Sequence, residues 1–231
     1  MKLFYLLLVL GLISCKTRSK KQTIESKLQL DSMAFQQIQN TNDFWEFSKF
    51  VLEYPESEFF YTALQKYHST RDAYFDSIDM PIIDCFRNCA NIQIKGDQRI
   101  LFEHKLVKLE ALHDSLLNFY LNDEYDESKP EKKYIEDVYG KPQEISKGHI
   151  QVQYINDSCA VLQNVMKEIS CSIFSYKKYL SQKWYHKKWE KLEIEERDHL
   201  NFLFYNRLII FGWDEEYVVP PPPPPPTEYE K

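Results

Sequence analysis

The chain has 231 residues, of which 43% are hydrophobic, 15% aromatic and 28% charged. This length and this apolar content exclude wholesale disorder and suffice for one or two domains with a buried core. Only five glycines are present, which argues against a glycine-rich phosphate-binding loop. The net charge of −6 argues against a general affinity for nucleic acid.

An apolar run at the N-terminus predicts an export signal. Residues 3–13 are apolar apart from Gly11, and basic residues follow from Lys16. A helix of this length rises about 16 Å, too little to cross about 30 Å of hydrocarbon, so the run is typical of a secretory signal. Leu12-Ile13-Ser14-Cys15 resembles the lipobox of bacterial lipoproteins, which implies cleavage before Cys15 and a diacylglycerol on its sulfur. An ordinary signal peptide or a short buried helix is the alternative.

We therefore expect residues 1–14 to be a signal peptide and residues 15–30 to be the lipidated Cys15 with a basic, polar tether. The basic residues of the tether would favour an anionic membrane surface. No acidic cluster follows Cys15, so we expect an anchor on the periplasmic side of a bacterial membrane. The sequence leaves open whether this is the inner or the outer membrane.

Four cysteines remain once Cys15 is set aside, and an even number in an oxidising compartment allows two disulfides with three connectivities. The disulfide candidates are Cys85, Cys89, Cys159 and Cys171. The spacing of Cys85 and Cys89 is not a zinc signature, because no second Cys or His pair follows at a suitable distance. We expect no metal and no cofactor.

Residues 31–80 read as a helical segment. Apolar side chains recur at helical spacing from Phe44 to Leu52, and again from Phe59 to Tyr67. Tyr54-Pro55 separates the two runs, because proline disfavours the helical conformation of the preceding residue. The pair resembles a single tetratricopeptide-like repeat. One copy is too few to stack, so we expect the pair to pack on its neighbour rather than to build a peptide groove.

Residues 81–212 read as an α+β domain. Ile92 and Ile94 alternate with polar residues, residues 96–98 turn the chain, and residues 100–102 return, which predicts a β-hairpin. A leucine-rich helix is expected from Leu106 to about Asn122. Residues 122–148 are polar and contain prolines and glycines, which predicts a long surface loop.

The second half of this domain repeats the alternation of strand and helix. Residues 150–154 predict a strand, and residues 156–158 supply a helix N-cap. The helix that follows carries apolar residues from Leu162 to Leu180 at steps of three or four. A further helix over 193–204 and a short strand at 208–211 complete the unit. We expect a small sheet with helices packed on one face.

The segment from about Cys85 to Phe211 resembles the periplasmic domain of ExbD/TolR proteins, in the long form of TonB-type systems of Bacteroidetes-like bacteria. The resemblance depends on an order of features: Arg87-Asn88 before the strand, Gly96-Asp97-Gln98-Arg99-Ile100-Leu101-Phe102-Glu103, Asn118-Phe119-Tyr120-Leu121-Asn122, Lys129-Pro130-Glu131-Lys132-Lys133, Ser146-Lys147-Gly148-His149-Ile150, Lys187-Lys188-Trp189-Glu190-Lys191-Leu192 and Glu195-Glu196. These motifs are structural, and no catalytic signature is among them.

The resemblance implies a homodimer that contacts TonB-like partners or the cell wall. It also implies a transmembrane helix with a proton-carrying Asp, from which this sequence departs. No stretch of about 20 apolar residues is present, and the one apolar run holds no Asp. We therefore expect a lipid-tethered domain that does not conduct protons and that serves as an accessory protein.

The C-terminal segment, residues 213–231, is expected to be a disordered, proline-rich tail. Its seven consecutive prolines favour a preformed polyproline II helix, which an aromatic-lined groove can bind at low entropic cost. They resemble the proline-rich stretches of TonB-like proteins; a stiff end without a partner is the equal alternative. The candidate binding residues are Pro220, Pro221, Pro222, Pro223, Pro224, Pro225 and Pro226.

A basic segment with interleaved aromatic residues is a second candidate for partner binding. Such a segment could bind an acidic partner or anionic lipid. The alternative is an amphipathic helix whose lysines face water and whose tryptophans cover the sheet. The segment contains Lys177, Lys178, Lys183, Trp184, Lys187, Lys188, Trp189 and Lys191.

We expect no enzymatic activity and no catalytic residue. His113-Asp114-Ser115 is a local coincidence on a helix, where adjacent residues do not face one another. The chain is therefore expected to be an adaptor lipoprotein of a TonB-type energy-transduction or envelope complex that binds other proteins. The alternative is an envelope scaffold unrelated to energy coupling, which recruits partners through its helical segment and proline tail.

Overall fold

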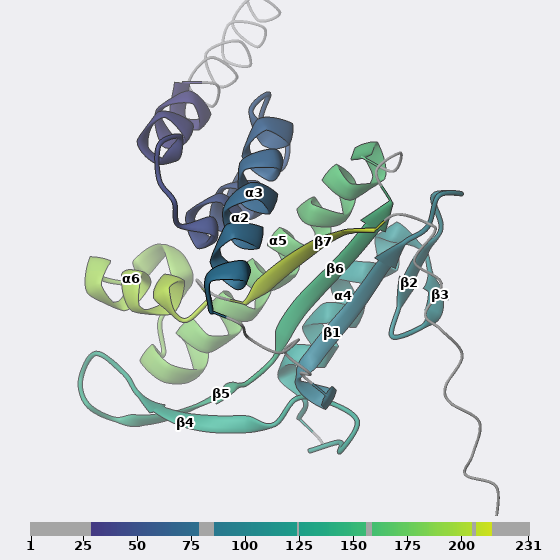
Figure 1. Cartoon of the computed structure of the whole chain (residues 1–231). Helices are drawn as coiled ribbons and strands as arrows, with labels where there is room; N and C mark the ends of the chain where they lie inside the picture. The colour runs from purple at the N-terminus through teal and green to yellow at the C-terminus, as the bar shows by residue number, and fades with distance from the viewer. Residues whose placement is uncertain (1–28, 79–85, 124, 156–158, 205–206, 214–231) are drawn as a thin grey trace, which may run out of the picture.

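The computed structural model describes residues 29–78, 86–123, 125–155, 159–204 and 207–213 (Figure 1). They form an α+β fold, as the sequence predicts, with one five-stranded sheet and one two-stranded sheet. No helix among these residues is long and apolar enough to cross a membrane. The expected signal peptide, Cys15, the N-cap at residues 156–158 and the proline run lie outside the described residues.

The central sheet has the strand order β3-β2-β1-β6-β7. β1 (Cys89–Ile94) pairs antiparallel with β2 (Ile100–Phe102), which pairs antiparallel with β3 (Lys105–Val107). β6 (His149–Ile155) lies parallel to β1, and β7 (Leu208–Trp213) lies parallel to β6. The predicted hairpin and both later strands are therefore confirmed. β3 and β7 are the two edges of this sheet.

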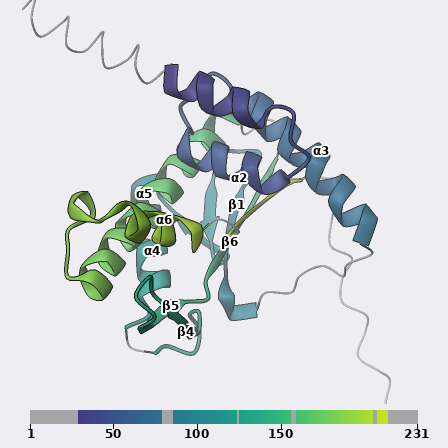
Figure 2. The ribbon, with the colours of Figure 1, turned by 90° about the vertical axis from the view of Figure 1, so that its left-hand side faces the viewer.

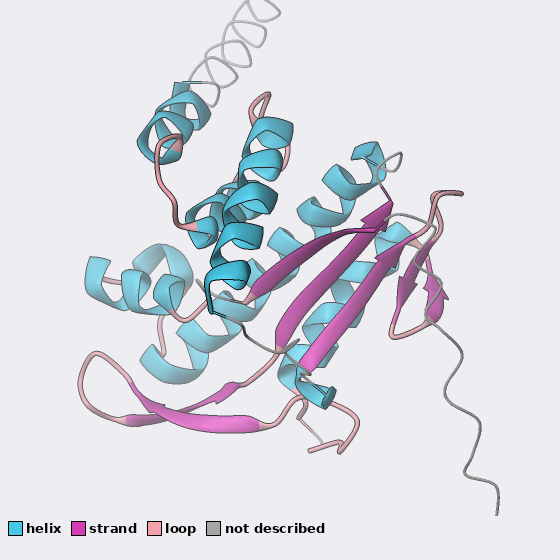
Figure 3. Cartoon of the chain, in the orientation of Figure 1, coloured by secondary structure: helices cyan, strands magenta, loops and turns pink. Residues whose placement is uncertain are grey.

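Two helices cover one face of the sheet and bury their apolar sides against it in the core. α4 (Leu109–Leu121) and α5 (Cys159–Tyr185) pack against each other behind β1 and β6, and no described helix is drawn in front of these two strands (Figure 3). Every second residue of β6 is buried, and so are the apolar residues that α5 carries at helical spacing. Each of these aliphatic side chains contributes about 1.5–3 kcal/mol by leaving water.

The N-terminal helices lie beside the β7 edge of the sheet. Residues 29–38 are helical, so the expected tether, which extended to residue 30, is wrong for its last two residues. α2 (Phe44–Glu53) begins after Asp43, whose side chain accepts a hydrogen bond from Trp45 N at 2.9 Å. α3 (Phe60–Ile78) follows the Tyr54-Pro55 break. As expected, the α2–α3 pair packs on its neighbours, which are α5 and β7.

The expected long loop over 122–148 is wrong, because it contains a β-hairpin. β4 (Lys132–Glu136) pairs antiparallel with β5 (Pro142–Ser146) around a turn in which Asp137 accepts from Tyr139 N and Lys141 N. This hairpin lies at the opposite end of the molecule from the α2–α3 pair (Figures 1 and 2). Polar residues dominate both strands, and only Ile145 and Ser146 are buried, so the usual apolar alternation is absent.

Two boundaries also differ from the sequence prediction. The leucine-rich helix begins at Leu109 and not at Leu106, because Leu106 belongs to β3. α6 (Ile194–Phe202) follows a single 3₁₀ turn, η3 (Trp189–Lys191), and is shorter than expected at its C-terminal end. A reciprocal pair of hydrogen bonds between Glu193 and Glu196 fixes its start.

Candidate interaction surface

The predicted basic and aromatic segment is folded back onto the body of the protein. Trp184 is only 5% exposed, and Lys183 Nζ lies 3.3 Å from Glu144 Oε2 on the β4–β5 hairpin. Lys187 Nζ donates to both oxygens of Glu196, at 2.9 and 3.0 Å. Trp184 is therefore part of the core, whereas Lys183 and Lys187 make ion pairs within the molecule instead of simply facing water.

The end of the same segment also makes internal contacts. The Trp189 ring is half-buried and meets the Phe174 ring edge to face, with 5.4 Å between the ring centroids. Lys188 is exposed and precedes the η3 turn. Within this segment, Lys188 and Lys191 are the predicted partner-binding lysines that are exposed without such a side-chain contact in the described chain.

The cysteines do not all pair as expected. Cys89 is the first residue of β1 and is disulfide-bonded, whereas Cys171 on α5 is a free, exposed thiol. The prediction of two disulfides among four cysteines is therefore wrong for Cys171. Cys85 lies outside the described residues, and Cys159 is the first residue of α5.

The β7 edge of the sheet is closed by side chains from the helical pair. Ser48 Oγ on α2 donates to Leu208 O at 3.1 Å, and Tyr67 OH on α3 accepts from Ile210 N at 2.9 Å. Arg71 on α3 donates to Ile210 O. An unprotected edge strand is a template for pairing with another chain, so these three side chains remove that template at β7.

Burial reinforces this closure. Tyr67 is 0% exposed, and burial is the main reason why the pKa of its hydroxyl is raised to about 12. The neighbouring His68 Nε2 lies 3.0 Å from Tyr154 OH on β6. Burial, assisted by Arg71, lowers the pKa of His68 to about 4, so this ring stays neutral between α3 and the sheet near pH 7.

The β3 edge is built differently. Glu103 and His104 form the two-residue turn between β2 and β3, with φ angles of 50° and 63°. In such a hairpin the pair that flanks the turn is hydrogen-bonded, and the next pair, Leu101 and Leu106, is not. The N–H and C=O of Leu106 therefore point away from β2. Within the described residues nothing pairs with them.

An apolar hollow lies beside this open edge. Its volume is about 560 Å³, and we call it the β3 groove; it is lined by Gln98, Arg99, Ile100, Leu106, Val107, Lys108, Leu109, Val161 and Asn164. Leu106 is 66% exposed, so its side chain is accessible to a partner. An exposed leucine beside unpaired backbone groups is suited to an extended peptide segment.

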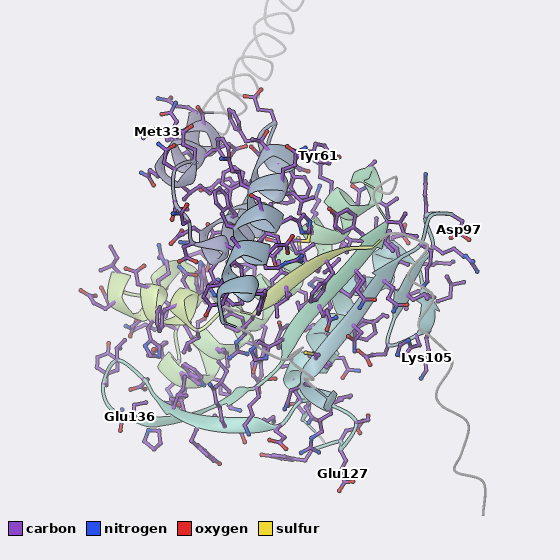
Figure 4. All side chains as sticks on the ribbon, viewed as in Figure 1. Met33, Tyr61, Asp97, Lys105, Glu127 and Glu136 are labelled. Atoms are coloured by element: carbon purple, nitrogen blue, oxygen red, sulfur yellow. The ribbon has the colours of Figure 1, made fainter. Side chains whose placement is uncertain are left out.

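The groove has a basic residue in its wall. Lys108 lines it and makes no ion pair in the described part of the chain, while Arg99 is paired with Asp97 at 2.5 Å. Figure 4 shows Asp97 and Lys105 on the side of the molecule away from Met33 in the N-terminal helix. The ammonium group of Lys108 beside an apolar groove favours a partner segment that carries acidic residues.

The open face of the sheet is less suited to docking. Its central glutamines bond to each other, since Gln93 Nε2 donates to Gln153 Oε1 at 3.0 Å. Polar groups that are already paired offer little to a partner. The β3 groove is therefore the better candidate for the interaction surface.

His113 and Asp114 form a hydrogen-bonded arrangement with Ser175, and not with Ser115, whose hydroxyl donates to Ala111 O. His113 Nδ1 lies 2.8 Å from Asp114 Oδ1, and His113 Nε2 lies 3.0 Å from Ser175 Oγ on α5. Sequence reasoning missed Ser175, because only the packing of α4 on α5 brings it to the histidine. Ser175 sits inside a long helix whose N–H groups are bonded within the helix, so its own element supplies no oxyanion hole. The Asp114 side chain is 86% exposed, which weakens its hold on the imidazole.

We found no protein-family model, no curated protein and no solved structure that matches the chain. In the part of the chain that the structure describes, no three His, Cys, Asp or Glu side chains lie close enough to hold a metal ion.

Proposed function

We propose that this protein is a lipid-anchored adaptor of the bacterial envelope that binds an extended segment of a partner protein along β3. The observation that supports the proposal is the contrast between the two sheet edges. Ser48, Tyr67 and Arg71 close β7 with side-chain hydrogen bonds, whereas β3 presents Leu106 and a groove of about 560 Å³. The backbone groups of an unpaired edge strand can accept an extended partner segment, and the pockets beside the strand can receive its side chains.

The affinity expected of this site is modest. A three-residue edge offers the two outward backbone groups of Leu106, which are worth about 0.5–1.5 kcal/mol per hydrogen bond. The apolar walls of the groove must supply the rest of the binding free energy. We therefore expect a transient complex with a dissociation constant in the micromolar range, which corresponds to a binding free energy of about −8 kcal/mol.

The cellular location of the protein is an expectation that rests on the N-terminal sequence. The lipobox-like Leu12-Ile13-Ser14-Cys15 supports a lipid on Cys15, which would hold the domain on the periplasmic side of the membrane. Replacing Cys15 with Ala should release the protein from membranes. Continued membrane retention of the variant would contradict the anchor.

The similarity to ExbD/TolR proteins supports a TonB-type complex as the partner, and an envelope complex unrelated to energy coupling is the alternative. Affinity purification from solubilised membranes distinguishes the two by the proteins recovered. The homodimer implied by the similarity is tested by light scattering at micromolar concentrations, where a strictly monomeric species would contradict it.

A pair of variants connects recovery of the partner to the β3 edge. Leu106→Pro removes the outward N–H and leaves the hairpin bonds intact, since a proline is tolerated where an edge N–H faces solvent. Ile194→Ser removes an apolar side chain that is 68% exposed at the start of α6. We expect Leu106→Pro to lose the partner and Ile194→Ser to keep it. Equal recovery with both variants would contradict docking at β3.

A further inference from the structure

A second hollow lies where α2, α5, α6 and the start of β7 meet, at the edge of the sheet opposite to β3. Its volume is about 330 Å³. Leu52 from α2 and Phe202 and Phe204 from the end of the α6 region supply apolar walls. Lys177 from α5 and Asn201 from α6 supply polar groups. We call this hollow the Lys177 pocket.

The ammonium group of Lys177 makes few contacts for a half-buried charge. Its Nζ donates to Asn201 Oδ1 at 2.9 Å and lies 5.5 Å from the centroid of the Phe204 ring. Among the described residues no carboxylate lies within ion-pair distance of it. An ammonium carries three donor hydrogens, so two of them are left for a ligand. A half-buried charge without a carboxylate in direct contact costs free energy, and a bound anion would recover part of that cost.

From this geometry we propose that the Lys177 pocket binds a small organic carboxylate, whose oxygens accept hydrogen bonds from Lys177 Nζ and whose apolar body packs on Leu52, Phe202 and Phe204. The carboxylate would also meet the exposed Asn201 amide. Asp198 lines the same hollow from α6 and opposes an anion, but it is exposed to solvent and screened. Lys49 lines it from α2 and favours an anion.

The charge of Lys177 gives the binding a distinctive pH dependence. Burial lowers the pKa of Lys177 to about 8, with Glu53 on α2 raising it and Lys49 lowering it. Burial also raises the pKa of Glu53, and Lys49 and Lys177 oppose that rise. A carboxylate binds the protonated amine, so its affinity should be constant well below pH 8. Above pH 8 the affinity should fall about tenfold for each pH unit.

Benzoate is a suitable probe, because it joins a carboxylate to a flat apolar ring. Benzyl alcohol is the matched neutral molecule, and inorganic phosphate is an anion without the apolar body. Chemical-shift titration of purified isotope-labelled protein reports on the site directly through the side-chain amide of Asn201. We expect benzoate to shift this signal at millimolar concentrations, at least tenfold more tightly than either of the other two compounds.

Lys177→Gln should weaken benzoate binding at least tenfold, because it removes the charge-assisted hydrogen bond. Lys178→Gln is the matched control; it makes the same charge change one residue away, at an exposed position, and should alter the affinity less than twofold. If Lys177→Gln does not fold, the pH series on the unchanged protein is a separate test. No shift of Asn201, equal binding of benzyl alcohol or of phosphate, or an affinity that is flat from pH 7 to pH 10 would each overturn the proposal.

Discussion

Closure of the β7 edge predicts that two buried tyrosines respond differently to loss of the hydroxyl group. Tyr67 and Tyr120 are both 0% exposed, and both rings belong to the core. Tyr67 OH accepts from Ile210 N at 2.9 Å, whereas Tyr120 OH has no hydrogen-bond partner among the described residues. The variants Tyr67→Phe and Tyr120→Phe keep the ring and remove the same atom.

The expected magnitudes follow from the hydrogen bonds. Tyr67→Phe leaves the buried N–H of Ile210 without an acceptor, and such a group costs about 1–3 kcal/mol. Tyr120→Phe removes a hydroxyl that is buried and unpaired, so the free energy of unfolding should stay within about 0.5 kcal/mol or rise. The difference between the variants should exceed about 1 kcal/mol, which corresponds to about 2–4 °C in Tm for a chain of this size.

Urea denaturation followed by circular dichroism measures both variants on one scale, with an unchanged m value as the check that only stability has changed. If Tyr120→Phe were as costly as Tyr67→Phe, the hydrogen bond to Ile210 would contribute nothing, and the edge of β7 would be closed by packing alone. The contrast between the two sheet edges would then lose its chemical basis.

Three further predictions concern other buried groups. The pKa of His68 is about 4 in the folded protein and its ordinary value is 6.5, so the unfolded state binds a proton more readily. The contribution of His68 to the free energy of unfolding should therefore be complete above pH 6.5 and fall as the pH drops towards 4. The stability difference between wild type and His68→Gln should shrink over that interval, and a constant difference would contradict the neutral ring. Arg207 is 6% exposed and donates to Leu203 O, Ser146 O and Gly148 O at 2.8, 2.7 and 3.1 Å. Arg207→Lys keeps the charge but cannot reach all three carbonyls, so denaturation should show that the free energy of unfolding falls by about 2 kcal/mol or more. An unchanged free energy of unfolding would mean that the Arg207 guanidinium does not hold the three carbonyl groups together. Ser175 should not react with a fluorophosphonate probe, because its helix offers no oxyanion hole, and labelling that disappears in His113→Ala would show that the Asp114–His113–Ser175 arrangement is an active nucleophile.

The elements with apolar periodicity could be predicted from the sequence. Alternation at Ile92 and Ile94 gives β1, and the three- and four-residue steps from Leu162 to Leu180 give α5, because both elements bury one side against the same core. The β4–β5 hairpin could not be predicted in this way. Its strands, such as Lys132–Glu136, carry polar side chains on exposed positions, so no apolar period marks them.

The candidate sites were harder to predict than the fold. Leu106 fits the leucine spacing of α4, and only the turn at Glu103 and His104 assigns it to β3. Lys177 belongs by sequence to a basic segment that faces water, yet α2 and α6 enclose it. Both errors have one origin, since local spacing says which face of a helix is apolar but does not say which other elements come to lie against it.

The central claim, that β3 receives a partner segment, is tested most directly by photocrosslinking in cells. A photoreactive amino acid in place of Leu106 samples the β3 groove, and the same group in place of Tyr134, which is 74% exposed on β4, samples an unrelated surface. We predict an adduct with one defined envelope protein from position 106, stronger than from position 134 and reduced when Val107 is changed to Lys. Equal adducts from both positions, or none from position 106, would contradict the claim.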